Sequence, residues 1–170
     1  MLWVGRFRTV AGAARGAFAS TLAVAKRALA ASVAAEQPYD VVVGFSWGGA
    51  LAVELLKAQR WAGPLVLLAP AHRLVAAVST TGAPETEPQS PQSPSPPFVR
   101  LPTGTVVIHS NTDTLVPLEH SVNLVKQQPA EAKCRFVEVN GDRHAMWSIA
   151  SDGSLVRAVL EVAATARPSE

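Results

Sequence analysis

The chain has 170 residues, of which 48% are hydrophobic and 16% are charged, and its formal net charge is +2. This length suits one domain with a real core, and the small charge without a basic stripe argues against a nucleic-acid partner. The single cysteine excludes an internal disulfide, and no apolar run approaches the roughly 20 residues of a membrane span. We therefore expect one globular domain in a cytoplasmic protein.

The N-terminal part of the chain has two interpretations. Residues 1–35 contain no acid, and five basic residues punctuate this alanine-rich stretch, a composition typical of an organelle-targeting peptide. The alternative is a helix that packs on the sheet, since apolar side chains spaced by four, seven and four residues share one helical face. The residues on this face are Phe18, Leu22, Leu29 and Val33.

A strand, a tight turn and a helix are predicted around Ser46. A run of valines leads into Gly-Phe-Ser-Trp-Gly-Gly at 44–49, and a helix-forming stretch follows. Glycine has no Cβ, so we expect Gly44 and Gly48 to let the strand reverse into the helix without a collision. The serine at the apex is expected to take up a strained backbone conformation. The helix that starts at Trp47 directs its amide groups and its positive dipole end toward the serine.

The middle of the chain contains a short strand and an insertion. Residues 65–69 are wholly apolar, as expected of a parallel strand that is covered on both faces. Residues 83–97 are rich in Pro and Ser without a large apolar side chain, so we expect a disordered insertion within a single domain spanning 1–170. The expected helices are 47–60, about 118–128 and about 152–166, the last with Asp152 as its N-cap.

Two later strands each lead to a candidate functional residue. Residues 105–109 form a β-branched run that ends in a polar turn carrying Asp113, and the loop after the strand at 134–139 carries His144. A serine nucleophile needs a base, and the base needs an acid that orients it. Because ligands bind at the carboxyl ends of the strands in open α/β sheets, we expect Ser46, Asp113 and His144 to meet there.

The glycine-flanked serine at 44–48, followed in chain order by an acid and a histidine, resembles the α/β-hydrolase superfamily, in particular its small serine esterases and thioesterases. The resemblance implies an α/β fold with three layers, α/β/α, and a mostly parallel sheet. It implies cleavage of carboxylic esters or thioesters of small molecules, with Ser46 as nucleophile, His144 as base and Asp113 as orienting acid. The backbone amide of Trp47 would contribute to the oxyanion hole, and the reaction needs no cofactor and no metal.

Other polar residues nearby receive secondary or structural interpretations. Asp142 lies two residues before His144 and is the second choice for the acid. His109 occupies a position where the superfamily often has histidine followed by glycine, and we interpret it as structural. No pair of histidines has the spacing of a metal site. Cys134 is expected to be a small, buried side chain within a strand.

The resemblance covers about residues 10–166, but only the second half of the fold, so we expect a truncated α/β-hydrolase fold. About 40 residues precede the nucleophile strand, and they contain no histidine-glycine pair that would supply the second oxyanion-hole amide. The strand at 41–45 is therefore expected to be an exposed sheet edge, through which a homo-oligomer could form. The alternatives are a catalytically impaired binding or partner module and a fragment of a longer hydrolase.

Overall fold

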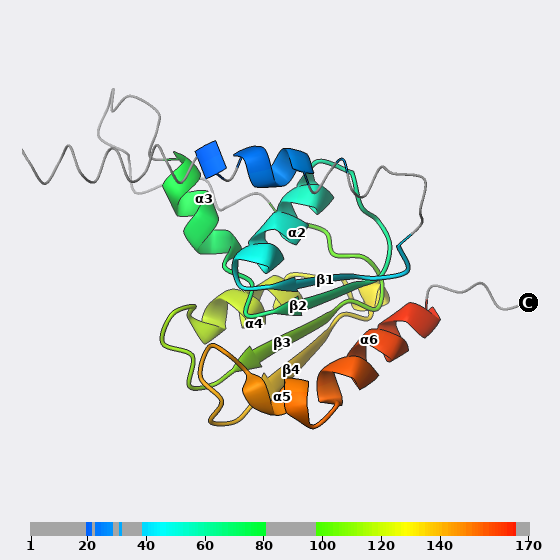
Figure 1. Ribbon diagram of the computed structural model, residues 1–170. Coiled ribbons are helices and arrows are strands. Elements are labelled where there is room, and N and C mark those ends of the chain that lie inside the picture. Colours follow the sequence, from blue (N-terminus) through cyan, green and yellow to red (C-terminus); the bar gives the residue numbers. More distant parts are fainter. Residues whose placement is uncertain (1–19, 22, 29–30, 32–38, 81–97, 166–170) are drawn as a thin grey trace, which may run out of the picture.

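Strands and helices alternate along most of the chain (Figure 1). The computed structural model describes residues 20–21, 23–28, 31, 39–80 and 98–165. None of the helices in these ranges combines the length and the apolar character that crossing a bilayer requires. The elements in chain order are β1 (Val42–Phe45), α2 (Trp47–Lys57), β2 (Leu65–Leu68), α3 (His72–Thr80), β3 (Val106–Ser110), α4 (Leu118–Lys126), the 3-10 helix η1 (Ala130–Ala132), β4 (Arg135–Val139), α5 (Trp147–Ser151) and α6 (Ser154–Thr165).

The strands form a parallel sheet in the order β1-β2-β3-β4. In this register, Leu68 lies between Phe45 and Ile108, and Val137 follows on the other side of Ile108. Every residue of β2 and β3 is buried. This agrees with the wholly apolar sequence of β2 and with the apolar first three residues of β3, which ends in the buried polar residues His109 and Ser110. Because all strands run in the same direction, their carboxyl ends meet along one edge of the sheet, where the loops that follow them lie together.

Helices cover both faces of the sheet, which gives the three layers α/β/α (Figure 1). Neighbouring residues of β3 point to opposite faces, as strand geometry requires. Ile108 lies in a cluster with Ile149 of α5 and Val162 of α6. Val107 lies in a second cluster, with Val53 of α2 and Leu124 of α4. Each fully buried aliphatic side chain stabilises the fold by about 1.5–3 kcal/mol. The predicted α/β fold with a parallel sheet is confirmed.

Strand β1 is an edge of the sheet within the part of the chain that the structure describes. Val43 is 46% exposed and Phe45 is 44% exposed, whereas the adjacent strand β2 is buried throughout. The edge position agrees with the expectation from the sequence. An open strand edge can accept another strand, so oligomerisation through β1 stays a prediction.

Residues 20–21, 23–28 and 31 are helical and lie beside α2 (Figure 1). Lys26 joins this segment to α2. Its ammonium group pairs with Glu54 of α2, which also pairs with Lys57. Burial raises the pKa of Glu54, but the hydrogen bonds from the two lysines outweigh it and hold this pKa below its ordinary value. Several predictions concern residues outside the described ones: Phe18, Leu22, Leu29 and Val33, the basic start of the chain, and the insertion at 83–97.

The end of the chain differs in detail from the prediction. The closing helix α6 begins at Ser154, because Gly153, with a φ of 78°, separates it from the short helix α5, which the sequence analysis missed. The Asp152 carboxylate accepts the Ser154 N–H at 2.7 Å, and this hydrogen bond lowers the pKa of Asp152. The expectation for Cys134 was wrong, because this residue precedes β4 and is only partly buried. Burial still raises the pKa of its thiol.

Candidate active site

Ser46 lies between the carboxyl end of β1 and the first residue of α2, at the apex of the predicted turn. Its φ of 49° and ψ of −112° are rare for an L-residue and store strain. Its N–H donates to the carbonyl oxygen of Leu68 at 2.8 Å, and its own carbonyl accepts the N–H groups of Ala50 at 3.1 Å and Ala71 at 3.0 Å. The strained conformation expected at this serine is therefore present, and strand β2 and the loop after it hold it in place.

Gly44 and Gly49 are the glycines that the turn requires. A Cβ on Gly44 would lie 2.8 Å from the carbonyl oxygen of Gly48, and a Cβ on Gly49 would lie 2.9 Å from the Cα of Pro70. A Cβ on Gly48 would meet nothing within 4 Å. The expectation that Gly48 relieves a collision was therefore wrong. The close contact between helix α2 and the loop after β2 lies at the next residue, Gly49.

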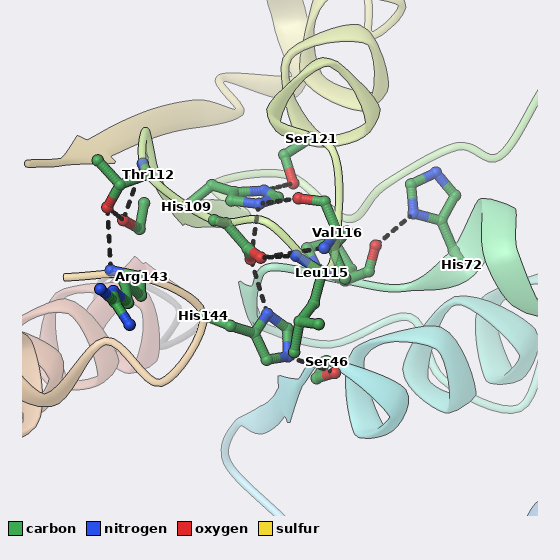
Figure 2. A network of polar contacts seen from close by, with 12 residues as sticks. Ser46, His72, His109, Thr112, Leu115, Val116, Ser121, Arg143 and His144 are labelled. Atoms are coloured by element: carbon green, nitrogen blue, oxygen red, sulfur yellow. Dashed lines mark hydrogen bonds and ion pairs between the residues drawn. The ribbon is translucent and has the colours of Figure 1, made fainter. Parts of the chain in front are cut away.

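The structure brings the side chains of Ser46, His144 and Asp113 into one line of hydrogen bonds, and Figure 2 shows the first two of them in contact. Nε2 of His144 lies 2.8 Å from Ser46 Oγ, and Nδ1 lies 2.7 Å from Asp113 Oδ2. An ionised carboxylate only accepts, so Nδ1 carries the hydrogen and Nε2 is left to accept the hydroxyl hydrogen of Ser46. The His144 side chain is 18% exposed and that of Asp113 is 0% exposed, so water is kept from the carboxylate.

Backbone N–H groups also hold the carboxylate of Asp113, through hydrogen bonds to its other oxygen, Oδ1. Oδ1 accepts the N–H of Leu115 at 2.8 Å and that of Val116 at 3.0 Å. Burial alone would raise the pKa of Asp113, but the hydrogen bonds from His144 and from these two N–H groups outweigh it and lower the pKa. Asp113 is therefore ionised at neutral pH and points toward the imidazole.

The loops after β3 and β4 are joined to each other by hydrogen bonds. The N–H of Arg143 donates to Thr112 Oγ1 at 3.1 Å, and the N–H of Gly141 donates to Asn111 Oδ1 at 3.2 Å. Arg143 has a φ of 48°, so the chain turns sharply just before His144. These contacts fix the spacing between the acid-bearing loop and the histidine-bearing loop (Figure 2).

Asp142, the second choice for the acid, has a different set of partners. Its Oδ2 accepts the N–H of Ser148 at 2.7 Å, and its carbonyl oxygen accepts the N–H of Met146 at 3.3 Å. Asp142 therefore ties the loop after β4 to the first turn of α5. The carboxylate that contacts His144 is that of Asp113.

Two residues next to the candidate site were not assigned to it from the sequence. The ring of Phe45 lies beside His144, with ring centroids 5.1 Å apart and an angle of 37° between the planes. His109 was interpreted as structural, and it is buried, but its Nε2 also lies 3.2 Å from Asp113 Oδ2. The available signal for His109 was its place four residues before Asp113. Nothing in the local sequence pointed from Phe45 to His144.

Trp47 is the first residue of α2, so its backbone N–H lies at the positive end of this helix, next to Ser46. Residues 1–19 lie outside the described residues. Within the described ranges, no three His, Cys, Asp or Glu side chains are grouped so that they could hold a metal ion.

Comparison with solved structures finds hydrolases of low identity. MGS-MChE2, an α/β-hydrolase enzyme from a sediment metagenome of the Mar Chica lagoon in Morocco, is 15% identical with a TM-score of 0.49, covering 80% of this chain and 68% of that one. Est1E from Butyrivibrio proteoclasticus is 18% identical with a TM-score of 0.42, covering 69% of this chain and 60% of that one. The meta-cleavage product hydrolase CumD from Pseudomonas fluorescens IP01 is 15% identical with a TM-score of 0.45, covering 76% and 65%.

The chain therefore spans less than two thirds of the length of Est1E and of CumD. No curated protein matches it. The family model described as serine hydrolase (FSH1) matches residues 9–145, a range that includes Ser46, Asp113 and His144. This match extends over well more than half of the chain, so the chain belongs to the serine hydrolase (FSH1) family.

Proposed function

We propose that this member of the family cleaves carboxylic esters or thioesters of small molecules, with Ser46 as nucleophile, His144 as general base and Asp113 as the orienting acid. The observation that carries the proposal is the line of hydrogen bonds from Ser46 Oγ to His144 Nε2, at 2.8 Å, and from His144 Nδ1 to Asp113 Oδ2, at 2.7 Å. This is the arrangement that serine hydrolases on unrelated folds share.

In the first half of the proposed reaction, Ser46 Oγ attacks the carbonyl carbon while its proton moves to His144 Nε2. The carbonyl oxygen becomes an oxyanion, for which the backbone N–H of Trp47 is a donor. The tetrahedral species then collapses: the bond to the alcohol or thiol breaks, and His144 gives its proton to the leaving oxygen or sulfur. An acyl group remains on Ser46. Asp113 keeps its negative charge and stabilises the imidazolium that forms in between.

In the second half, a water molecule attacks the acyl carbon and gives one proton to His144 Nε2. The bond between the acyl carbon and Ser46 Oγ breaks, His144 returns the proton to Oγ, and the carboxylic acid leaves. Each donor in an oxyanion hole contributes about 3–4 kcal/mol to the stabilisation of this transition state. The rate therefore depends on how many donors accompany Trp47.

The surroundings of Ser46 favour a substrate with an apolar part. Phe45 is 44% exposed and lies beside His144, and Leu115, two residues after Asp113, is 66% exposed. Apolar side chains next to a nucleophile fit the hydrocarbon portion of an ester or thioester. The chemistry proposed here uses side chains and backbone amides of this chain, and it calls for no cofactor and no nucleic-acid partner.

A fluorophosphonate probe tests the proposal, because it reacts covalently with activated serines. Mass spectrometry of the labelled chain should find the adduct on Ser46, and Ser46→Ala should abolish it. Ser151→Ala is a matched control, since Ser151 Oγ donates only within α5, to the carbonyl oxygens of Trp147 and Ser148. An adduct elsewhere, or no adduct on folded protein, would refute the proposal and favour a binding or partner module.

A further inference from the structure

His109 is a buried histidine whose ring belongs to the same line of polar contacts as His144 (Figure 2). It lies on β3, and its side chain is 0% exposed. Its Nε2 lies 3.2 Å from Asp113 Oδ2 and 3.0 Å from the carbonyl oxygen of Val116. Its Nδ1 lies 2.7 Å from Ser121 Oγ, which is also buried. Both ring nitrogens therefore have partners, and the reaction described above uses neither of them.

The partners decide which nitrogen of His109 carries the hydrogen. A carboxylate and a carbonyl oxygen can only accept, so Nε2 must carry a hydrogen and share it between them. In the neutral ring, Nδ1 then holds a lone pair, and the hydroxyl of Ser121 donates to it. Ser121 thereby stabilises the tautomer that presents an N–H to Asp113.

This N–H completes the set of donors around Asp113. Oδ1 already accepts from Leu115 and Val116, and Oδ2 accepts from His144 at 2.7 Å. Without His109, Oδ2 would have His144 as its single donor among these contacts, and only the hydrogen bonds at Oδ1 would oppose rotation of the carboxylate. A hydrogen bond to an ionised group is roughly twice as strong as one between neutral groups, so this contact restrains the carboxylate effectively.

We propose that His109 and Ser121 form a positioning pair, which holds Asp113 Oδ2 in the orientation that keeps the imidazole of His144 directed at Ser46. The inference rests on the proposed function, because it assigns a role in the same reaction. His109 touches neither substrate nor Ser46, and it acts through Asp113. Its contribution should appear in kcat, because the restraint matters most when His144 carries the transferred proton.

The first experiment compares His109→Met with His109→Gln in a p-nitrophenyl ester assay. Methionine fills a similar volume without a donor, whereas the glutamine amide restores an N–H near the place of Nε2. His109→Met should lower kcat on the order of 10- to 100-fold with little change in KM, as expected for a lost hydrogen bond to a charged group. His109→Gln should recover most of the rate. Equal kcat values for His109→Met and wild type would overturn the inference.

Thr105→Val is the matched control for buried polarity beside the same strand, since Thr105 directly precedes β3. Thr105 is 0% exposed, and its hydroxyl donates to the carbonyl oxygen of Pro102 at 2.7 Å, just before β3 begins. This variant should lower stability and leave kcat unchanged. A loss of kcat in Thr105→Val as large as that in His109→Met would show that general destabilisation is sufficient, and it would overturn the positioning role.

A double-mutant cycle shows whether His109 acts through Asp113. The double variant Asp113→Asn/His109→Met should label Ser46 with fluorophosphonate less than about 2-fold more slowly than Asp113→Asn alone, because the carboxylate to be positioned is already gone. An equal loss in both backgrounds would contradict the inference. The far-downfield NMR signal of the His144 Nδ1 proton should weaken in His109→Met and persist in His109→Gln.

The outcomes separate this inference from the proposed function. A wild-type chain that does not label at Ser46 would refute the proposed function, and this inference with it. A wild-type chain that labels, together with a His109→Met variant that labels equally fast, would refute the inference alone. Should His109→Met fail to fold, Ser121→Ala is the deciding variant, because it removes the hydroxyl that donates to Nδ1 of His109. A labelling rate that falls a few fold in Ser121→Ala, but not when Asp113→Asn is also present, supports the pair. An unchanged labelling rate overturns it.

Discussion

His72 should make the folded state less stable in mild acid, because its imidazole binds a proton more readily in the unfolded chain. This residue begins α3, and its Nδ1 lies 3.0 Å from the carbonyl oxygen of Pro70, to which it donates. Its ring meets that of His120 edge to face, with centroids 6.3 Å apart. Burial lowers the pKa of His72 to about 4, and the hydrogen bond to Pro70 offsets this only in part. The charges that act in the same direction as burial are those of His120, Arg73 and Lys57.

The direction of the pH effect follows from the two protonation states. A histidine in the unfolded chain titrates near pH 6.5, so between that pH and about 4 the unfolded chain binds a proton that folded His72 does not. The contribution of His72 to stability is therefore complete above pH 6.5 and falls as the pH drops through this window. For a fully buried ring the loss between pH 7 and pH 5 would be about 2 kcal/mol. Because this ring is partly exposed, we expect about 1–2 kcal/mol.

Urea unfolding at pH 7 and at pH 5 measures this loss. His72→Asn is the informative variant, because its amide can still donate to the carbonyl oxygen of Pro70 and does not titrate. The wild type should lose about 1–2 kcal/mol more than His72→Asn when the pH falls from 7 to 5. Carboxylates titrate in both proteins, so their contributions cancel in the difference. Equal losses in the two proteins would refute the reasoning.

Three further predictions concern the candidate site and the sheet edge. In a p-nitrophenyl ester assay, Asp113→Asn should lose on the order of 10⁴-fold in kcat and Asp142→Asn far less, and the reverse ranking would overturn the choice of acid. In urea unfolding, Gly49→Ala should lower stability by about 1–3 kcal/mol, since its Cβ would lie 2.9 Å from the Cα of the proline after β2. Gly48→Ala should be neutral or stabilising by up to about 1 kcal/mol, and a larger loss there than at Gly49 would contradict the packing argument. Native mass spectrometry with hydrogen exchange should find either a homo-oligomer or rapid exchange in Val42–Phe45, and a monomer protecting these amides as strongly as β3 would disprove the open edge.

Some features of the protein follow from local chemistry and could be read from the sequence. Continuous apolar runs separated by helical stretches predict parallel strands covered on both faces, and the sheet has this form. The run at 44–49 predicts a strand that turns sharply into a helix, because glycine and a strained serine suit few other structures, and the structure has this turn. The loops carrying Asp113 and His144 were predicted in the same way, from the strands that precede them.

Tertiary structure alone decided which glycine is indispensable and what surrounds the acid. Gly49 of α2 is required because Pro70, from the loop after β2, lies against it, and no pattern near Gly49 shows that contact. Helix α5 was missed since five residues carry a weak signal, and such a short helix depends on packing of residues such as Ile149. His109 meets Asp113 and Ser121 only because β3, its loop and α4 fold back on one another. A sequence encodes local conformation residue by residue, whereas these contacts depend on distances between segments, which exist only once the sheet and its helices have packed.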